Sequence, residues 1–226
     1  IRICNDKWET YQFCRKNGFL TPKTWLHLSD VKAALEAGEI SYPVIIKPRW
    51  GMGSIAIYQA ENAEELEVLT KKVTREIFRS YLRYESAFDE EECVLFQEMI
   101  HGQEHGLDVI HDLDGAWQLT VVREKIAMRS GDCARVLSDE RIASVGTAVG
   151  KALGHIGNLD MDVFVTEDAV YVLELNARFG GGYPFSHLAG VNLPKAIIKW
   201  LSGEALTDEL VVKKTGLYAQ KDIRMI

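Results

Sequence analysis

Near its carboxyl end the sequence places an acid, an amide and a cation at every second residue. Glu174, Asn176 and Arg178 would share one face of a β-strand, because strand side chains alternate between faces. Asp162 lies in an earlier apolar segment that would pair, as a hairpin, near the level of Glu174. Carboxylate and amide oxygens suit Mg²⁺ or Mn²⁺, and a guanidinium can hold phosphate bidentately. The pattern therefore predicts a metal and phosphate site, with a solvent-facing polar strand as the alternative.

A lysine at the end of an apolar run indicates a second phosphate contact. Lys47 follows Val44-Ile45-Ile46 and precedes a glycine loop, which we define as Gly51, Met52, Gly53 and Ser54. Backbone N–H groups of such a loop can bind phosphate oxygens. An exposed lysine beside an ordinary turn explains the local pattern equally well. The loop is neither a P-loop nor a dinucleotide fingerprint, because it lacks the P-loop letters and is followed by an expected strand.

Residues 96–104 predict a weaker contact with a nucleoside. An apolar strand runs into a short connection, where backbone groups of Glu98, Met99 and Ile100 can offer a donor and acceptor pattern to adenine. Glu104 can accept hydrogen bonds from ribose hydroxyls. His101 and His105 do not form a helical metal motif, since Gly102 interrupts any helix between them. Surface or core roles explain both histidines better.

The composition limits the classes of function. A chain of 226 residues with 47% hydrophobic content can bury a sizeable core. Its formal net charge of −7 argues against broad binding to nucleic acid or a membrane surface. The four cysteines form no CxxC pair, which favours reduced thiols. No apolar run approaches the ~20 residues of a membrane span, and no signal peptide is evident, so we expect a cytoplasmic protein.

The elements that would position these residues mix helices with hairpins. Asp114-Gly115 is a strong hairpin signal between two apolar segments, and the acidic run 89–92 is expected to be a solvated loop. The pattern favours an α+β fold with mostly antiparallel sheet. We expect helices at about 6–17, 29–37, 138–153 and 193–202, and a long helix that begins at Asn62 and includes Val73. We expect strands at 44–47, 54–58, 94–96, 107–110, 116–122, 161–165 and 170–175.

Taken in order, these motifs resemble the ATP-grasp family over about residues 5–205. Asp6-Lys7 before a helix and Lys47 with its glycine loop resemble the first half, and residues 97–104, Asp162 and Glu174-Leu175-Asn176-Ala177-Arg178 resemble the second. The nearest branches are carbamoyl-phosphate synthase large subunits and D-alanine–D-alanine ligases. The resemblance implies two α+β lobes with mostly antiparallel sheets that clasp ATP. Residues 1–28 would be an N-terminal helix and connector, 29–98 the small lobe and 99–226 the large lobe.

The resemblance also implies a role for each matched position. Lys7 and Lys47 would contact phosphates beneath the glycine loop, while Glu98, Met99 and Ile100 would hold adenine and Glu104 the ribose. Asp162, Glu174 and Asn176 would bind Mg²⁺ or Mn²⁺, and Arg178 the transferred phosphoryl group. Arg123, Lys125 and Arg129 would lie near the acceptor, with Arg123 as a second catalytic group. An ordinary solvated basic strand is the alternative for these three.

The implied activity is ATP-dependent activation of a carboxylate or bicarbonate as an acyl phosphate, followed by attack of an amine or similar nucleophile. The alternative is a non-catalytic nucleotide-binding or regulatory module. The sequence departs from the family pattern at Ala177, where proline is usual, and at Gln97, where many members have an acid. An α/β domain usually precedes the Asp-Lys helix, so we expect that this chain is a fragment or works with a separate chain. A homodimer is compatible with the resemblance.

Overall fold

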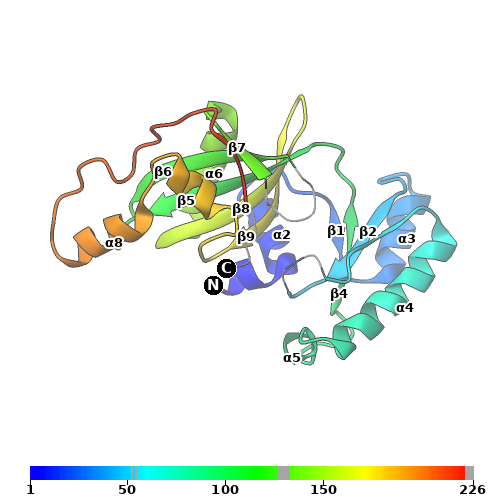
Figure 1. The fold of residues 1–226 in the computed structure, drawn as a ribbon. Helices are drawn as coiled ribbons and strands as arrows, with labels where there is room; N and C mark the ends of the chain where they lie inside the picture. Colours follow the sequence, from blue (N-terminus) through cyan, green and yellow to red (C-terminus); the bar gives the residue numbers. More distant parts are fainter. Residues whose placement is uncertain (52, 54, 127–132, 222–226) are drawn as a thin grey trace. The chain divides into compact units, whose positions relative to one another are not determined.

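The computed structural model describes the chain except for residues 52, 54, 127–132 and 222–226. The chain divides into two compact units (Figure 1). Unit 1 comprises Ile1–Lys16 and Thr21–Ile100, and unit 2 comprises Asn17–Leu20 and His101–Ile226. Each unit has its own antiparallel sheet, so the α+β class expected from the sequence is confirmed.

Unit 1 contains a four-stranded antiparallel sheet with the strand order β1-β4-β2-β3. The apolar run Val44–Ile46 forms its centre, and α4 lies alongside the sheet (Figure 1). Asn62 caps α4 by accepting a hydrogen bond from the backbone N–H of Glu65. The strands are β1 (Thr24–Trp25), β2 (Val44–Pro48), β3 (Tyr58–Ala60) and β4 (Val94–Glu98), and the helices are α1 (Arg2–Asn5), α2 (Lys7–Lys16), α3 (Leu28–Glu36), α4 (Ala63–Arg79) and α5 (Arg83–Ser86).

Unit 2 is a six-stranded antiparallel sheet in the order β10-β7-β6-β5-β8-β9. The helix α6 packs against β5, β6 and β8, while residues of α7 and α8 join a core with Val121 and Val136. The strands are β5 (Gln103–His111), β6 (Trp117–Lys125), β7 (Cys133–Leu137), β8 (Gly157–Val165), β9 (Val170–Asn176) and β10 (Tyr218–Gln220), and the helices are α6 (Glu140–Leu153), α7 (Tyr183–Leu188) and α8 (Leu193–Leu201).

Both expected hairpins are present as β5–β6 and β8–β9. The expected strand at residues 54–58 is wrong, because Ile55 and Ala56 form a turn and β3 begins only at Tyr58. Ala56 has a φ of 55°, which is incompatible with a strand. The cap of α6 is Asp139 and not Ser138, since the Asp139 carboxylate accepts from the N–H of Ile142. The acidic run 89–92 is irregular, as expected, but Glu92 pairs with Arg49. No helix within the described ranges is long and apolar enough to cross a membrane.

Two histidines of unit 2 are expected to make the stability of the folded chain depend on pH. His111 is fully buried, and its ring lies 6.1 Å edge-on from that of His155. Burial lowers the pKa of His111, and the neighbouring His155 lowers it further. Burial also lowers the pKa of His155. The unfolded chain, with histidine pKa values near the ordinary ~6.5, therefore binds protons more readily than the folded chain as pH falls below that value.

We expect the free energy of unfolding to fall as the pH drops through about 6.5. Part of that slope should vanish in His111→Phe, because an apolar ring has no proton to take up. Urea unfolding at several pH values from neutral to mildly acidic measures the slope, and His101→Gln at an exposed position is the matched control. An equal slope in wild type and His111→Phe would contradict this assignment.

Candidate functional site

The β8–β9 hairpin brings the predicted metal-binding residues onto one face of the large sheet. Asp162 pairs with Glu174, and Asp160 pairs with Asn176. Directly paired residues of antiparallel strands share a face, as do residues two apart on one strand. Between them, Met161 and Leu175 point to the opposite face and are fully buried. Acidic and amide side chains therefore form a compact polar group on one side of the hairpin.

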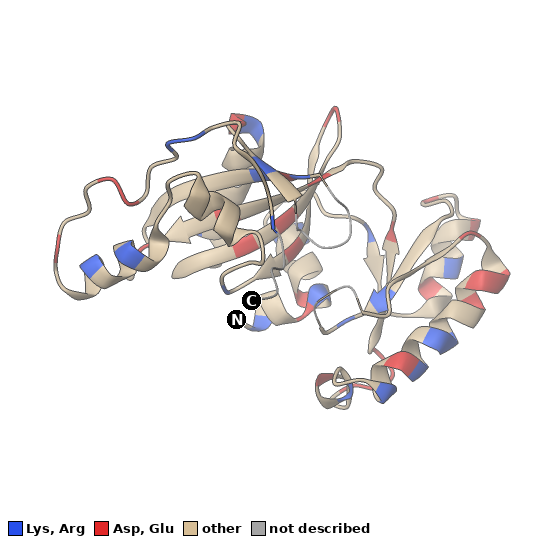
Figure 2. Cartoon of the chain, in the orientation of Figure 1, with Lys and Arg blue, Asp and Glu red and all other residues tan. Residues whose placement is uncertain are grey.

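Strands β5 and β6 extend this polar group with further charges. Gly106 of β5 pairs with Asp162 on one side and with Arg123 on the other. The Lys125 ammonium lies 2.7 Å from Asp162 Oδ1 and 2.5 Å from Glu104 Oε1. Figure 2 shows acidic and basic stretches side by side on strands of this sheet. We call this set the charged face: it consists of Glu104, Asp108, Arg123, Lys125, Asp160, Asp162, Glu174, Asn176 and Arg178.

The balance of charge on this face suits a divalent cation. Its five carboxylates (104, 108, 160, 162 and 174) outnumber its three cationic side chains (123, 125 and 178), an excess of two negative charges. Among the described residues, no three His, Cys, Asp or Glu side chains are arranged to hold a metal. The predicted set has only two carboxylates and one amide, as expected for Mg²⁺ that keeps positions for phosphate and water.

The Asp162 carboxylate is in an environment that disfavours its charge. Burial raises its pKa to about 6, although Lys125 acts in the opposite direction. Burial disfavours the ammonium of Lys125 as well, but Asp162 and Glu104 outweigh it and raise the lysine pKa. Both groups are therefore charged at neutral pH, and the pair forms an ion pair within the charged face.

The two predicted catalytic arginines lie in different environments. Arg178 is 43% exposed, and its Nη1 donates to Asp160 Oδ2 at 2.8 Å. Arg123 is only 3% exposed and pairs with Asp108 and Asp160. The alternative of a solvated basic strand is therefore wrong for Arg123. Arg129 lies outside the described residues.

In unit 1, Lys47 is buried and not exposed as the alternative interpretation of the sequence required. Its ammonium donates to Gln97 Oε1 at 2.8 Å, and Gln97 Nε2 donates to the Thr24 hydroxyl at 2.9 Å. The sequence identified Gln97 only as a departure from the family pattern. Its contact with Lys47 depends on the pairing of β2 with β4, which the local sequence does not reveal.

The start of α2 lies beside the glycine loop within unit 1. Asp6 caps α2 by accepting from the N–H of Trp8, and it forms a buried ion pair with Arg49. The Lys7 ammonium donates to the carbonyl oxygen of Gly51 at 2.6 Å. Gly51 and Gly53 both have positive φ, 118° and 76°. Met52 and Ser54 of the glycine loop lie outside the described residues.

The residues predicted to bind the nucleoside lie in the last positions of unit 1 and the first positions of unit 2. The N–H of Glu98 donates to the carbonyl oxygen of Lys23, and its carboxylate accepts from the N–H of Lys23. An acceptor role for Glu98 therefore falls to its own carbonyl group. Met99 and Ile100 are half-buried at the end of unit 1. Glu104 belongs to unit 2, where it holds Lys125.

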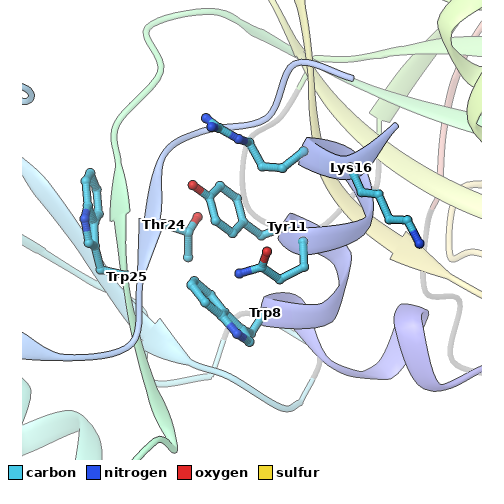
Figure 3. A pocket seen from close by; sticks show the side chains of 7 residues that line it. Trp8, Tyr11, Lys16, Thr24 and Trp25 are labelled. Atoms are coloured by element: carbon cyan, nitrogen blue, oxygen red, sulfur yellow. The ribbon is translucent and has the colours of Figure 1, made fainter. Parts of the chain in front are cut away.

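Unit 1 also has an open groove of about 540 Å³ between α2 and β1. Trp25 faces Trp8 and Tyr11 across it, whereas Lys16 points away (Figure 3). The complete lining is Trp8, Tyr11, Gln12, Arg15, Lys16, Thr24 and Trp25. This lining includes none of the residues predicted to bind ATP.

Comparison with known proteins agrees with this fold and its motifs. Residues 4–182 match the model of the ATP-grasp domain. A carbamoyl phosphate synthase large chain from Halobacterium salinarum is 30% identical over an alignment of 193 positions that covers 80% of this chain and 17% of that protein. The chain belongs to the ATP-grasp family, as its motifs predicted, and it spans about a sixth of that curated relative.

Solved structures share the fold at low identity. The biotin carboxylase domain of Hydrogenobacter thermophilus 2-oxoglutarate carboxylase, in complex with MgADP and bicarbonate, has a TM-score of 0.73 and 22% identity, over 92% of this chain and 48% of that one. The N5-carboxyaminoimidazole ribonucleotide synthetase of Thermotoga maritima has a TM-score of 0.67 and 19% identity, over 93% and 52%. The chain thus spans about half of each.

Proposed function

We propose that this chain is the nucleotide-binding part of a Mg-ATP-dependent ligase that activates a carboxylate or bicarbonate as an acyl phosphate. The pairing of Asp162 with Glu174 and of Asp160 with Asn176 carries the proposal. It sets three carboxylates and an amide on one face, and Arg178 reaches that face through Asp160. The relatives named above are a carbamoyl phosphate synthase, a biotin carboxylase domain and a synthetase, which supports this class of reaction.

In the proposed reaction, a carboxylate oxygen attacks the γ-phosphorus of ATP, and the bond to the bridging oxygen breaks to release ADP. An amine nitrogen then attacks the acyl carbon, phosphate leaves, and the nitrogen loses a proton. A bound Mg²⁺ would neutralise phosphate charge. Asp162, Glu174 and Asn176 would hold it, and Arg178 would orient the transferred phosphoryl group by charge-assisted hydrogen bonds.

Residues of unit 1 would bind the rest of the nucleotide. Lys47 and Lys7 supply ammonium groups for phosphate, and the two glycine-loop residues with positive φ allow a turn whose N–H groups can face an anion. The carbonyl of Glu98 and the backbone of Met99 and Ile100 would meet adenine, with Glu104 of unit 2 at the ribose. Within the charged face, Lys125 links Glu104 to Asp162 and would connect the ribose contact with the metal.

The test of this function separates binding from turnover. We expect millimolar Mg-ATP to raise the melting temperature of the folded chain by mass action. A screen of carboxylate and amine pairs for ADP release, with the longest available form of the protein, then identifies the substrates. Absence of any thermal shift would contradict the proposal. A thermal shift without ADP release from any pair would favour the non-catalytic nucleotide-binding module.

We expect Lys47→Ala to weaken ATP binding about ten- to a hundred-fold, the range for a charge-assisted hydrogen bond of roughly 1.5–3 kcal/mol. The reason is that the variant removes an ammonium group held beside Gln97. Calorimetric titration with Mg-ATP measures the dissociation constant. Lys32→Ala on the surface of α3 is the control, because Lys32 pairs with Glu67 near solvent and is not among the residues predicted to bind ATP. Equal affinities of Lys47→Ala and wild type would rule out the phosphate contact.

A further inference from the structure

The charged face contains a carboxylate that the motif does not include, Asp160. It lies two residues before Asp162 on the same side of β8 and pairs with Asn176. Its Oδ2 accepts from Arg178 Nη1 at 2.8 Å, and its Oδ1 accepts from Arg123 Nη2 at 3.3 Å. Each oxygen of Asp160 thus holds a guanidinium group, which distinguishes it from the residues predicted to bind metal.

The guanidinium of Arg123 is held in place by buried partners. Arg123 Nε donates to Asp108 Oδ2 at 3.0 Å, and both side chains are almost wholly buried. Asp108 also accepts from the Ser186 hydroxyl at 2.5 Å and from the Asn158 amide at 3.1 Å. Because every polar partner of Asp108 comes from a different element, its carboxylate is immobilised by β6, β8 and α7 together. Arg123 in turn presents a fixed cation to Asp160.

The glycines after Arg178 are required by this row of charges. A Cβ atom at Gly180 would lie 2.0 Å from Asp160 Oδ1, and one at Gly182 would lie 1.4 Å from Arg123 Nη1. Gly182 has a φ of −83°, so space and not backbone conformation demands glycine there. The segment that follows Arg178 therefore packs directly onto the Asp160 carboxylate and the Arg123 guanidinium. Gly180 and Gly182 thus leave room for side chains of the protein itself.

We propose that Asp160 is a positioning residue that holds the guanidinium of Arg178 ready for the transferred phosphoryl group, and that Arg123 and Asp108 hold Asp160 in place. This inference rests on the proposed function for the role of Arg178, but not for the contact itself. A long arginine side chain that is 43% exposed would otherwise sample several rotamers. An ordered guanidinium contributes more to a reaction because its orientation is fixed before the phosphoryl group arrives.

The proposal gives Arg123 and Arg178 different tasks. Arg178 retains donors for a phosphoryl group, since within the described part of the chain only its Nη1 donates, to Asp160 and to the Phe179 carbonyl. Arg123 directs its Nε and Nη2 to Asp108 and Asp160 and is enclosed. An aspartate serves both arginines because it offers two charged oxygens, whereas an asparagine would offer one neutral acceptor.

The first readout needs no nucleotide. The wild-type chain and the variants Asp160→Asn and Asp160→Ala are treated with phenylglyoxal, which modifies arginine. Peptide mass spectrometry gives the rate at which Arg178 is modified in each protein. We expect Arg178 to react about fivefold faster in Asp160→Ala, which corresponds to loss of one partly exposed ion pair. Asp160→Asn should be intermediate because it retains one acceptor and is the variant to use if Asp160→Ala does not fold. In the control variant Asp168→Asn, which changes the exposed turn of the same hairpin, phenylglyoxal should modify Arg178 at the wild-type rate.

The second readout tests the consequence for phosphoryl transfer. MgADP is titrated with and without aluminium fluoride, which mimics the transferred group. We expect both Asp160 variants to bind MgADP as wild type does, but to lose about tenfold of the extra affinity that aluminium fluoride confers. A purely structural defect would weaken both titrations alike.

The outcomes separate the two proposals. Unchanged labelling of Arg178 in folded Asp160→Asn would overturn the positioning role, whatever the nucleotide data show. Faster labelling with unchanged aluminium fluoride affinity would overturn its importance for phosphoryl transfer. Failure of the wild-type chain to bind MgADP would instead overturn the proposed function, while the labelling rates would still decide whether Asp160 holds Arg178.

Discussion

Glu174→Gln is expected to lower the rate of phosphoryl transfer by at least about 100-fold. Loss of a group that only supports a metal ligand costs up to about 100-fold, and Glu174 is proposed to be a ligand itself. Glu174 pairs with Asp162 at the centre of the charged face. The substitution keeps the shape of the side chain but removes one of the two charges assigned to the cation. The fold should survive, because Glu174 is half-buried and the apolar residues beside it are unchanged.

Two measurements test this expectation. Titration with Mn²⁺ followed by electron paramagnetic resonance should show weaker metal binding in Glu174→Gln, and ADP release should recover in part at higher metal concentration. Glu167→Gln in the exposed hairpin turn is the matched control, since it makes the same change of charge on the same hairpin. Normal Mn²⁺ affinity in Glu174→Gln would remove Glu174 from the metal site.

Asn176→Asp should weaken the binding of Mg-ATP more than the binding of the metal alone, because it adds a negative charge beside the phosphates.

Asp108→Ala is expected to lower the free energy of unfolding by about 3–5 kcal/mol, the usual cost of removing one partner from a buried ion pair. Asp108 has no exposed surface, and its carboxylate accepts from Arg123, Ser186 and Asn158. The alanine variant leaves the Arg123 guanidinium buried with only part of its compensating charge. Two polar side chains would lose their acceptor at the same time.

Urea denaturation followed by tryptophan fluorescence and by circular dichroism measures this loss, and coincidence of the two curves checks that one transition is observed. Asp168→Ala, at an exposed position, should change the free energy by no more than about 0.5 kcal/mol. A loss below about 1 kcal/mol in Asp108→Ala would contradict this expectation, because removal of one partner should leave the buried Arg123 guanidinium with less compensating charge.

Local patterns of the sequence were sufficient for much of the fold. The two-residue period of Glu174, Asn176 and Arg178 and the Asp114-Gly115 turn predicted both hairpins of unit 2, because strand alternation and turn chemistry act over a few residues. The same patterns failed at residues 54–58, where apolar letters that resemble a strand form a turn. The short strand β7 and the short helix α7 were not predicted, since few residues give little periodic signal.

The candidate site was predictable only as far as single hairpins extend. The sequence by itself determined that an acid and an amide, Glu174 and Asn176, share one face of β9, and its motifs identified the family. The predicted strand position of Arg178 was wrong, because β9 ends at Asn176 and the N–H of Arg178 donates to the Asn176 carbonyl in a turn. Only the tertiary structure decided that Asp160 holds Arg178, that Arg123 is enclosed by Asp108 and Asp160, and that Lys125 bridges Glu104 to Asp162. These contacts depend on the register of β5 against both β6 and β8. That register is fixed by burial of whole strand faces across distant segments, which no local spacing encodes.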